Sequence, residues 1–533
     1  MKSEYKQSYD NLSGHKIREQ NIKECLKVFD LIKTSLGPIS MDKLIINEVG
    51  DMIVTNDGAN ILKCLEIKHP ATKILVNLAN QQDEEVGDGT TSVVLLASEL
   101  LKRADVMIKN KIHSSVIISA FRLAMCYSSY IIREKLSLNI DNYNFKVLLN
   151  VAKTSLSSKI SGINAKKFST FTLEAVKSVK NSENYSKKFK CQLKIINFIK
   201  IEGQGINMSR LIDGCAISGQ KIIPEMSNQI SPARIICFDS DLKRSRMKLG
   251  VQIEGKFNKN IEKIVKKETE IVKKKVLKLA ITGINVVLTS KGIDDFVVKL
   301  FHKNGIIAVR RVSLDDLKRI AISCGTKVQK VFHSNKFKDT KKSVYFGVAE
   351  EIFEQDLNSF KFITIRGCSF CPGNSILLRG ANTYLLEEMS RSLVDSISVL
   401  KRTIEGKKLV AGGGSCETAL SILLEKLSNS VPSREQLPIS EYGEALMTIP
   451  KILVTNAGIN DLGILAKLRV LHLASSGKKN YRCRYYGLDL SNGRLQNNIL
   501  SGIIEPAMSK IKSIQMATEA AITILRIDDF VVL

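Results

Sequence analysis

The sequence predicts a multidomain protein of mixed α and α/β class, with mainly helical ends and strands in the middle. The chain has 533 residues, which exceeds a single hydrophobic core and suggests about three domains. Apolar residues recur at helical spacing towards both ends, whereas short apolar runs alternate with a helical pattern between 234 and 309. Glycine-rich turns precede predicted helices in both end segments. We therefore expect the two ends to build one nucleotide-binding domain around a long insertion.

The composition is typical of a soluble globular protein, with 44% hydrophobic and 25% charged residues. The polar N-terminus lacks a signal-peptide core, and no apolar run approaches the roughly 18 residues that span a bilayer. The 11 scattered cysteines indicate reduced thiols rather than a disulfide framework. The one CxxC sequence, Cys368 to Cys371, has no second cysteine pair or histidine at ligand spacing, which favours an incidental pair over a zinc or redox site.

The chain is strongly basic, since 80 Lys and Arg face 53 Asp and Glu and give a net charge of +27. Such an excess suits a nucleic-acid-binding protein. The lysines are scattered, however, and aromatic residues for base stacking are sparse at 6%. Nucleic-acid binding therefore remains an alternative supported by charge alone, and salt-sensitive binding would be its signature.

The first part of the chain predicts several junctions between helices and turns. A helix with apolar residues from Ile17 to Leu36 ends at Gly37-Pro38. Strands at 44–46 and 52–55 form a predicted hairpin. Asp57 then opens a short helix, where helix capping alone explains an aspartate, and a further helix runs from Pro70 to about 82.

The segment Gly87–Ser92 (GDGTTS) opens directly into an apolar helical run that reaches Leu101. Glycines let the backbone approach a ligand, and the free amides of a helix start favour an anion. Asp88 would repel phosphates unless a divalent cation lay between them, so the turn suggests a nucleotide with magnesium. Ordinary helix capping explains the same six residues when they are considered alone.

The middle of the chain changes character twice. The segment 141–200 is polar and weakly periodic, and we interpret it as a connecting layer with a loop at 154–159. A strand at 234–238, a long basic helix at 261–279, a strand at 285–289, a helix at 293–302 and a strand at 306–309 then predict a βαβ unit. The basic helix suits a membrane surface, but interspersed glutamates favour a solvated helix that packs on its own domain.

Helical periodicity returns from Leu386 to Ile404, and Gly412–Gly414 precede a helix over 417–427. A third glycine-bearing loop follows at 487–493. The chain has neither the phosphate loop G-x-x-x-x-G-K-[ST] nor a dinucleotide fingerprint. The common nucleotide-binding folds are therefore unsupported.

Five motifs carry a resemblance to a known family: Thr34–Pro38, Thr55–Ala59, Glu85–Ser92, Arg379–Asn382 and Ala411–Gly414. In order and spacing they resemble those of the group II chaperonins over nearly the whole chain. Further stretches resemble one subunit type of the eukaryotic cytosolic members, namely 247–252, 308–312, 487–493 and 517–529. The chain departs from the family pattern at Asn460, Asp461 and Gly463, at Ala411, and over 221–232.

The resemblance implies a chaperonin fold in three domains. A mainly helical equatorial ATPase domain would comprise 1–146 and 404–533, and a small intermediate domain 147–212 and 365–403. An α/β apical domain with a helical lid protrusion would comprise 213–364. The helix over 292–302 resembles the apical client-binding helix, with an exposed stripe of Phe296, Val297, Leu300 and Phe301, although core packing explains the same residues.

The resemblance also implies the activity and the partners. ATP and Mg²⁺ would be the cofactors, and hydrolysis would drive folding of cytosolic polypeptides such as actin and tubulin. The partners would be paralogous chaperonin subunits in a hetero-oligomeric double ring, and unfolded clients, with no nucleic acid and no membrane. The alternative within the family is a structural ring subunit that binds nucleotide but hydrolyses little.

The family's site residues carry over to matching positions. Asp57 and Asp395 would activate water, and Asp88 would hold Mg²⁺. The nucleotide contacts would be Gly37, Pro38, Gly58, Gly89, Thr90, Thr91, Ser92, Ser157, Ser158, Lys159, Gly412, Gly413, Asp489, Glu505 and Lys510. By pattern alone Asp395 lies on the outer side of an amphipathic helix, so that helix would have to move to bring Asp395 from another domain to the nucleotide.

Overall fold

The computed structural model describes residues 14–46, 50, 52–65, 67, 69–139, 145–159, 164–180, 195–219, 221–243, 258–330, 346–357, 360–370, 373–459, 461–475 and 481–528. The chain divides into two compact units, Met1–Leu173 with Glu387–Leu533, and Glu174–Leu386. The two ends of the chain thus form one unit around an inserted middle, as the sequence predicts. The finer division into three domains stays a prediction.

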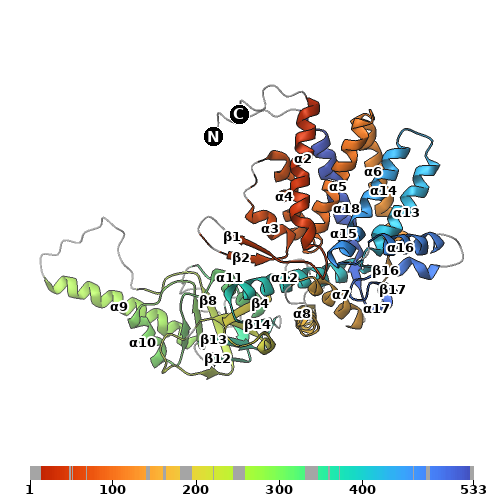
Figure 1. The fold of residues 1–533 in the computed structure, drawn as a ribbon. Coiled ribbons are helices and arrows are strands. Elements are labelled where there is room, and N and C mark those ends of the chain that lie inside the picture. The colour runs from red at the N-terminus through yellow and green to blue at the C-terminus, as the bar shows by residue number, and fades with distance from the viewer. Residues whose placement is uncertain are drawn as a thin grey trace. The chain divides into compact units, whose positions relative to one another are not determined.

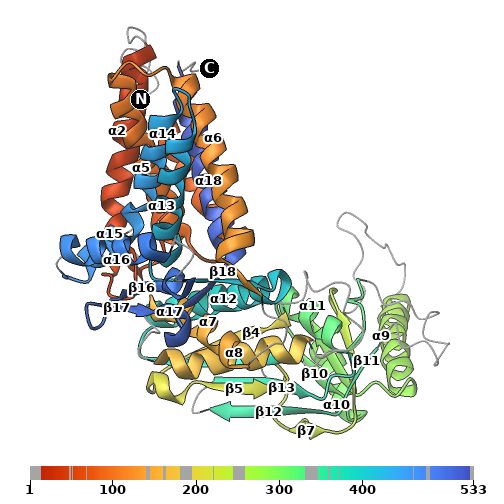
Figure 2. The same ribbon diagram turned by 90° about the vertical axis from the view of Figure 1, so that its right-hand side faces the viewer.

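The first unit is built mainly from helices, most of which lie side by side (Figures 1 and 2). They are α2 (Gly14–Ile32), α4 (Pro70–Glu85), α5 (Thr90–Lys109), α6 (Ser114–Ile131), α13 (Ser415–Ser430), α14 (Gln436–Leu446), α15 (Thr448–Asn456), α16 (Asp461–Ser475) and α18 (Ala507–Leu525). Shorter helices are η1 (Lys33–Ser35), α3 (Gly58–Cys64), η2 (Ile132–Leu136), α7 (Phe145–Ser157), η9 (Tyr481–Tyr485) and α17 (Asn498–Ser501).

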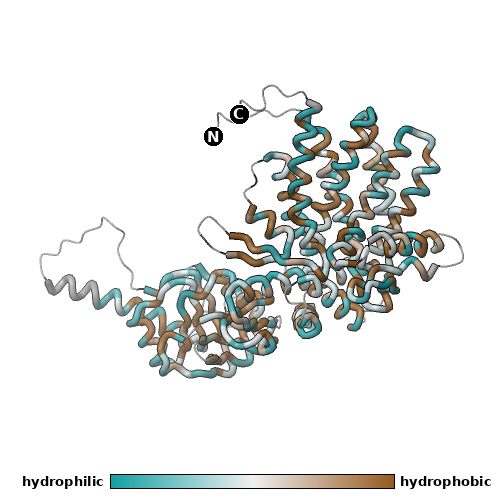
Figure 3. The backbone as a smooth tube through the Cα atoms, in the orientation of Figure 1, coloured by the Kyte–Doolittle hydropathy of each residue, from teal (hydrophilic) through white to brown (hydrophobic). Residues whose placement is uncertain are grey.

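Helix α5 is the central helix of this unit and contacts α2, α4, α14 and α18. Its apolar residues from Val93 to Leu101 are buried, and they join a core that also includes Phe121 of α6 and Tyr442 of α14. Hydrophobic and hydrophilic residues alternate along the surrounding helices (Figure 3), as burial of one face requires. The N-terminus of α5 is therefore fixed by the largest apolar core of the unit.

Small sheets bring distant segments of this unit together. Strands β1 (Lys43–Ile46) and β2 (Met52–Thr55) form the predicted antiparallel hairpin. Strand β15 (Lys408–Ala411) lies between β18 (Ile504–Pro506) and β3 (Leu138–Asn139) and leads into the turn 412–414. Strands β16 (Tyr486–Asp489) and β17 (Arg494–Asn497) form a second hairpin, and the turn between them, 490–493, is the second half of the predicted loop at 487–493.

Among its described residues the second unit contains three sheets, three α-helices that lie wholly within it and one 3₁₀ turn. The sheet orders are β10-β9-β8-β11, β6-β13-β12-β7 and β4-β14-β5. The strands are β4 (Asn197–Glu202), β5 (Arg210–Asp213), β6 (Cys215–Ser218), β7 (Gln229–Ile230), β8 (Ala233–Phe238), β9 (Val286–Thr289), β10 (Ile307–Val309), β11 (Gly347–Ala349), β12 (Glu351–Leu357), β13 (Phe360–Arg366) and β14 (Asn374–Gly380). The helices are η7 (Ile206–Met208), α9 (Asn258–Ile281), α10 (Asp295–Lys303) and α11 (Leu314–Ser323), of which η7 is a single 3₁₀ turn.

The predicted βαβ unit is confirmed, because β9 and β10 pair in parallel on either side of α10 in the chain. The basic helix α9 packs Val272, Val276 and Leu279 into the core beside α10, so the interpretation as a helix on its own domain is confirmed. The predicted client stripe on α10 is wrong for two of its four residues. Val297 and Phe301 are buried in this core.

The segment 141–200, which we interpreted as a polar connecting layer, contains two helices where it is described, and the boundary between the two units falls within it. Residues 145–157 form α7, and 165–180 form α8 (Ala165–Lys180). The predicted loop at 154–159 is in fact the last turn of α7 and the two residues beyond it. Helix α7 buries Leu148, Val151 and Leu156, which recur at helical spacing.

One further prediction needs correction, because the stretch Ser114–Leu136 is long and apolar enough to cross a membrane. In the structure α6 packs Ile117, Phe121 and Ala124 into the core of the first unit. Some sequence features lie outside the described residues: the N-terminal residues 1–13, the stretch 247–252, Asn460, Asp529, and Cys371 of the CxxC sequence. Predictions about them remain untested.

Candidate functional site

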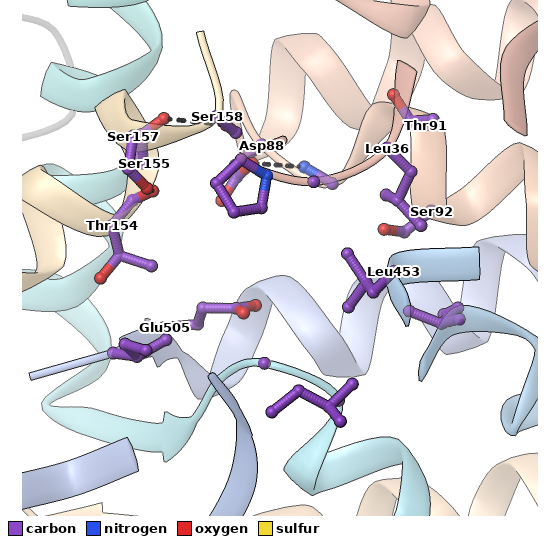
Figure 4. Close-up of a pocket in the computed structure, with 18 of the residues that line it drawn as sticks. Leu36, Asp88, Thr91, Ser92, Thr154, Ser155, Ser157, Ser158, Leu453 and Glu505 are labelled. Carbon is purple, nitrogen blue, oxygen red and sulfur yellow. Dashed lines mark hydrogen bonds between the residues drawn. The ribbon is translucent and has the colours of Figure 1, made fainter. Parts of the chain in front are cut away.

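A cavity of about 660 Å³ lies within the first unit, where segments from both ends of the chain meet. This volume is in the range of small-molecule sites. Figure 4 shows Thr154, Ser155, Ser157 and Ser158 along one side, Leu36, Thr91 and Ser92 along another, and Glu505 across from Asp88. The lining is part polar and part apolar, which suits a ligand with a charged end and a planar end.

The start of α5 forms one wall of the cavity. Gly89 is its N-cap residue with φ 77°, and no side chain caps the helix. A left-handed φ strains residues that carry a Cβ, so the turn depends on glycine here. The first amides of α5 and the hydroxyls of Thr91 and Ser92 therefore remain for a ligand, and the helix dipole favours an anion.

Asp88 lies at this wall, and its Oδ1 accepts a hydrogen bond from the amide of Gly89 at 2.8 Å. No cluster of three or more His, Cys, Asp or Glu exists among the described residues to cage a metal. Mg²⁺ is commonly held by one or two carboxylates together with substrate phosphates, rather than by a cage of protein ligands. The residues present thus fit a magnesium ion that arrives with a nucleotide.

Asp57 lies beside α5 and has two structural partners. Its carboxylate caps α3, accepting hydrogen bonds from the amides of Ala59 at 3.4 Å and Asn60 at 3.3 Å. Oδ1 also accepts a hydrogen bond from Thr90 Oγ1 at 3.0 Å. The capping explanation of Asp57 is therefore correct, and the same carboxylate also lines the cavity.

Asp395 lies on α12 (Thr383–Gly406), where the predicted exposed position is wrong. Only 6% of the residue is exposed, and its carboxylate pairs with the ammonium group of Lys159, which lines the cavity. Burial raises the pKa of Asp395 to about 7; Lys159 opposes this shift and the Asp57 charge adds to it. Burial lowers the pKa of Lys159, but attraction to Asp395, Asp57 and Asp88 outweighs it, so the pKa is raised.

The turn before α5 packs directly on α12 and brings Asp395 close to the cavity. Gly87 has φ 77°. A Cβ at this position would lie 2.6 Å from the Cβ of Ser398 and 3.7 Å from the Cα of Asp395. Only glycine allows this approach, so the glycine turn serves helix contact as well as ligand contact.

Helix α7 lines the cavity along a whole face that sequence analysis missed. Asn150, Lys153, Thr154 and Ser155 join the predicted Ser157, Ser158 and Lys159 at the wall. Asn56 Nδ2 donates to the carbonyl of Ser158 at 3.2 Å and so links the end of α7 to the segment that carries Asp57. The sequence signal that could have revealed this helix is the helical spacing of its polar residues on the face opposite Val151 and Leu156.

The opposite wall comes from the C-terminal segments and carries a charge triad. Lys510 Nζ lies 2.7 Å from Glu417 Oε1 and 2.7 Å from Glu505 Oε2. Burial raises the pKa of Glu505; Lys510 opposes this, and the Glu417 charge adds to it. Asp489 lies nearby at the end of β16, where hydrogen bonds led by that from the Ser491 hydroxyl lower its pKa.

The structure brings most of the predicted site residues to one cavity. The predicted residues at its wall are Gly37, Pro38, Asp57, Asp88, Gly89, Thr90, Thr91, Ser92, Ser157, Ser158, Lys159, Gly413, Asp489, Glu505 and Lys510. Three others lie behind it. Gly58 packs against Thr91, Gly412 accepts a hydrogen bond from Asn498, and Asp395 is reached through Lys159.

Comparison with known proteins identifies the family to which this chain belongs. The model of the TCP-1/cpn60 chaperonin family matches residues 28–533. The chain belongs to this chaperonin family. It is 44% identical to T-complex protein 1 subunit alpha of Arabidopsis thaliana over 98% of this chain and 96% of that protein.

Two further relatives place this chaperonin chain within its family. It is 41% identical to T-complex protein 1 subunit alpha of Dictyostelium discoideum, over 98% of this chain and 95% of that protein. It is 34% identical to thermosome subunit alpha of Aeropyrum pernix, over 97% of this chain and 91% of that protein. The resemblance to group II chaperonins is thus confirmed, and the subunit type indicated by the sequence is the alpha type.

Proposed function

We propose that this chain is an ATP-hydrolysing subunit of a group II chaperonin that folds polypeptides. The observation that supports hydrolysis most is the meeting of three elements at one cavity: the uncapped start of α5 with Asp88, the carboxylate of Asp57, and the pair of Lys159 with Asp395. Each element answers one need of phosphoryl transfer, which requires charge neutralisation, orientation of water and proton acceptance.

Each of these residues has a separate role in hydrolysis. The amides and hydroxyls of the first turn of α5 bind the phosphates, and Asp88 holds Mg²⁺, which supplies charge neutralisation when bound. Asp57 orients the attacking water. Lys159 turns to the terminal phosphate, and this frees Asp395 to accept the proton of the water.

A substitution of Asp395 tests this assignment. Asp395→Ala removes the proton acceptor but none of the phosphate contacts, so turnover should fall at least ~100-fold while ATP affinity changes little. Single-turnover hydrolysis and nucleotide titration on the full chain measure the two effects separately. Asp30→Ala, at an exposed aspartate of α2, is the control.

Normal turnover in Asp395→Ala would contradict the assignment. A wild-type chain that binds ATP but does not hydrolyse it would instead favour the alternative, a structural ring subunit. The retention of Asp57, Asp88 and Asp395 favours hydrolysis over that alternative.

The partners we propose are paralogous chaperonin subunits in a hetero-oligomeric double ring, with unfolded polypeptides such as actin and tubulin as clients in the cytosol. An exposed apolar surface on and before the β1–β2 hairpin supports a subunit contact, since Met41, Leu44 and Ile46 are 74%, 59% and 62% exposed. Native size measured with and without ATP tests this proposal. A particle many times larger than one chain is expected, and a monomer under all conditions would contradict it.

A further inference from the structure

Glu417 lines the cavity, and the proposed function has given it no role. It is the third residue of α13, after the N-cap Gly414, and only 3% of it is exposed. A carboxylate in the first turn of a helix is favoured by the helix dipole. The ammonium group of Lys510 also lies beside it, 2.7 Å from Glu417 Oε1.

The two oxygens of this carboxylate have different surroundings. Oε1 accepts a hydrogen bond from Lys510 Nζ at 2.7 Å. Oε2 is buried and has no hydrogen-bond partner. An ionised carboxylate accepts several hydrogen bonds, and a buried acceptor without a partner is unfavourable. The missing donor is therefore expected from a bound molecule whose entry displaces the atoms that cover Oε2.

The chemistry of the site restricts what that donor is. A second metal ion is disfavoured because the ammonium of Lys510 already lies between Glu417 and Glu505. An ionised phosphate has no proton to donate, and the carboxylate repels its charge. The hydrogen-bond donors of ATP are the adenine amino group and the ribose hydroxyls, all of which belong to the nucleoside.

We propose that Glu417 Oε2 accepts a hydrogen bond from the nucleoside of the bound nucleotide, which makes Glu417 a specificity-determining residue. This inference rests on the proposed function, because it takes ATP as the ligand. It orients the nucleotide in the cavity, with phosphates at α5 and nucleoside at α13. Figure 4 shows Glu505, which shares Lys510 with Glu417, across the cavity from Asp88.

The test uses calorimetric titration of the full chain with the magnesium complexes of ATP, ITP, 2′-deoxy-ATP and 3′-deoxy-ATP. ITP carries a carbonyl where ATP has the amino group, and each deoxy analogue lacks one hydroxyl. Glu417→Gln keeps the shape but turns a charged acceptor into a neutral amide. It should weaken ATP binding by about tenfold or more.

The analogue that lacks the donor read by Glu417 should bind wild type more weakly than ATP, and Glu417→Gln should change its affinity little. If only ITP binds wild type more weakly than ATP, the donor to Glu417 is the adenine amino group. If only one deoxy analogue binds more weakly, the donor is the hydroxyl that this analogue lacks. The matched control is Glu425→Gln, on the same helix in an exposed ion pair with Arg469. It should leave all four affinities unchanged.

Two results would overturn the inference. One is an unchanged ATP affinity in Glu417→Gln. The other is an equal loss for all four nucleotides together with a lower melting temperature without nucleotide, which indicates a structural role only. A wild-type chain that binds no Mg-ATP would overturn the proposed function itself, and this outcome is separate because it is measured before any variant.

Discussion

Two helix starts in the first unit have nearly the same backbone and different chemistry. Helix α5 follows Gly89 at φ 77°, and α13 follows Gly414 at φ 75°; neither has a side-chain cap. Both line the same cavity. They differ in the second helical residue, which is Thr91 in α5 and Cys416 in α13, and in the third, which is Ser92 in α5 and Glu417 in α13.

A buried amide side chain supports each of these turns. Gln82 Nε2 donates to the carbonyl of Asp88 at 2.9 Å, and Asn498 Nδ2 donates to the carbonyl of Gly412 at 2.7 Å. Both amides are fully buried. The two turns thus share a buried amide donor as well as a glycine at the N-cap position.

The comparison teaches that a glycine-led helix start is only a scaffold. Hydroxyls in the first turn of α5 leave its positive end open to an anion, whereas Glu417 neutralises the corresponding end of α13. The side chains of one turn decide which end of a nucleotide each helix receives.

Converting α5 to the α13 pattern should have the largest effect. Ser92→Glu places a carboxylate where phosphates are proposed to bind, so repulsion should weaken Mg-ATP binding by about 100-fold or more. Nucleotide titration measures this. Ser92→Gln is the control of equal size, and it should retain most of the affinity for Mg-ATP. Equal affinities for the two variants would contradict the claim that the charge at this position distinguishes α5 from α13.

The pH dependence of hydrolysis should follow Asp395. Burial raises its pKa to about 7, so the carboxyl is protonated at lower pH and cannot accept a proton. The ratio kcat/KM should therefore fall about tenfold per pH unit below about 7 and level off above it. Lys159→Met removes the charge that lowers this pKa, so its midpoint should lie at higher pH.

A profile of kcat/KM that is flat from pH 5 to 8 would contradict a role for Asp395 as the base. An unchanged midpoint in Lys159→Met would show that the two charges are not coupled during turnover. The profile of Asp30→Ala should match that of the wild type.

The two supporting amides should give the smallest effects. Gln82→Ala and Asn498→Ala each remove a buried amide that donates to a turn carbonyl, and each should lower the free energy of unfolding by about 1–3 kcal/mol. Chemical denaturation measures this loss. Because each variant disturbs a different turn, the losses should add in the double variant; a strongly non-additive result would mean that the turns form one coupled element.

Local patterns explain which parts of the fold were predictable. The helix that ends before Gly37, the β1–β2 hairpin and the start of α5 follow from periodicity and turn residues that are close in sequence. Helix α7 was missed although it is amphipathic, with polar residues at the cavity wall and Leu148, Val151 and Leu156 buried at helical spacing.

The site was predictable where a motif marks it and not where distant contacts create it. Burial of Asp395 depends on Lys159, which is 236 residues away in the sequence. Glu417 resembles an ordinary acidic residue at a helix start, and only its unpaired Oε2 distinguishes it. The surroundings of both residues arise from contacts made in the folded chain, so their spacing in the sequence does not reveal them.

A structure of the full chain with Mg²⁺ and a non-hydrolysable ATP analogue tests the central claim most directly. We predict phosphates at the amides of Thr90 to Ser92, the metal at Asp88, and the nucleoside beside Glu417. A nucleotide bound with its phosphates at α13, or outside the cavity, would contradict the account.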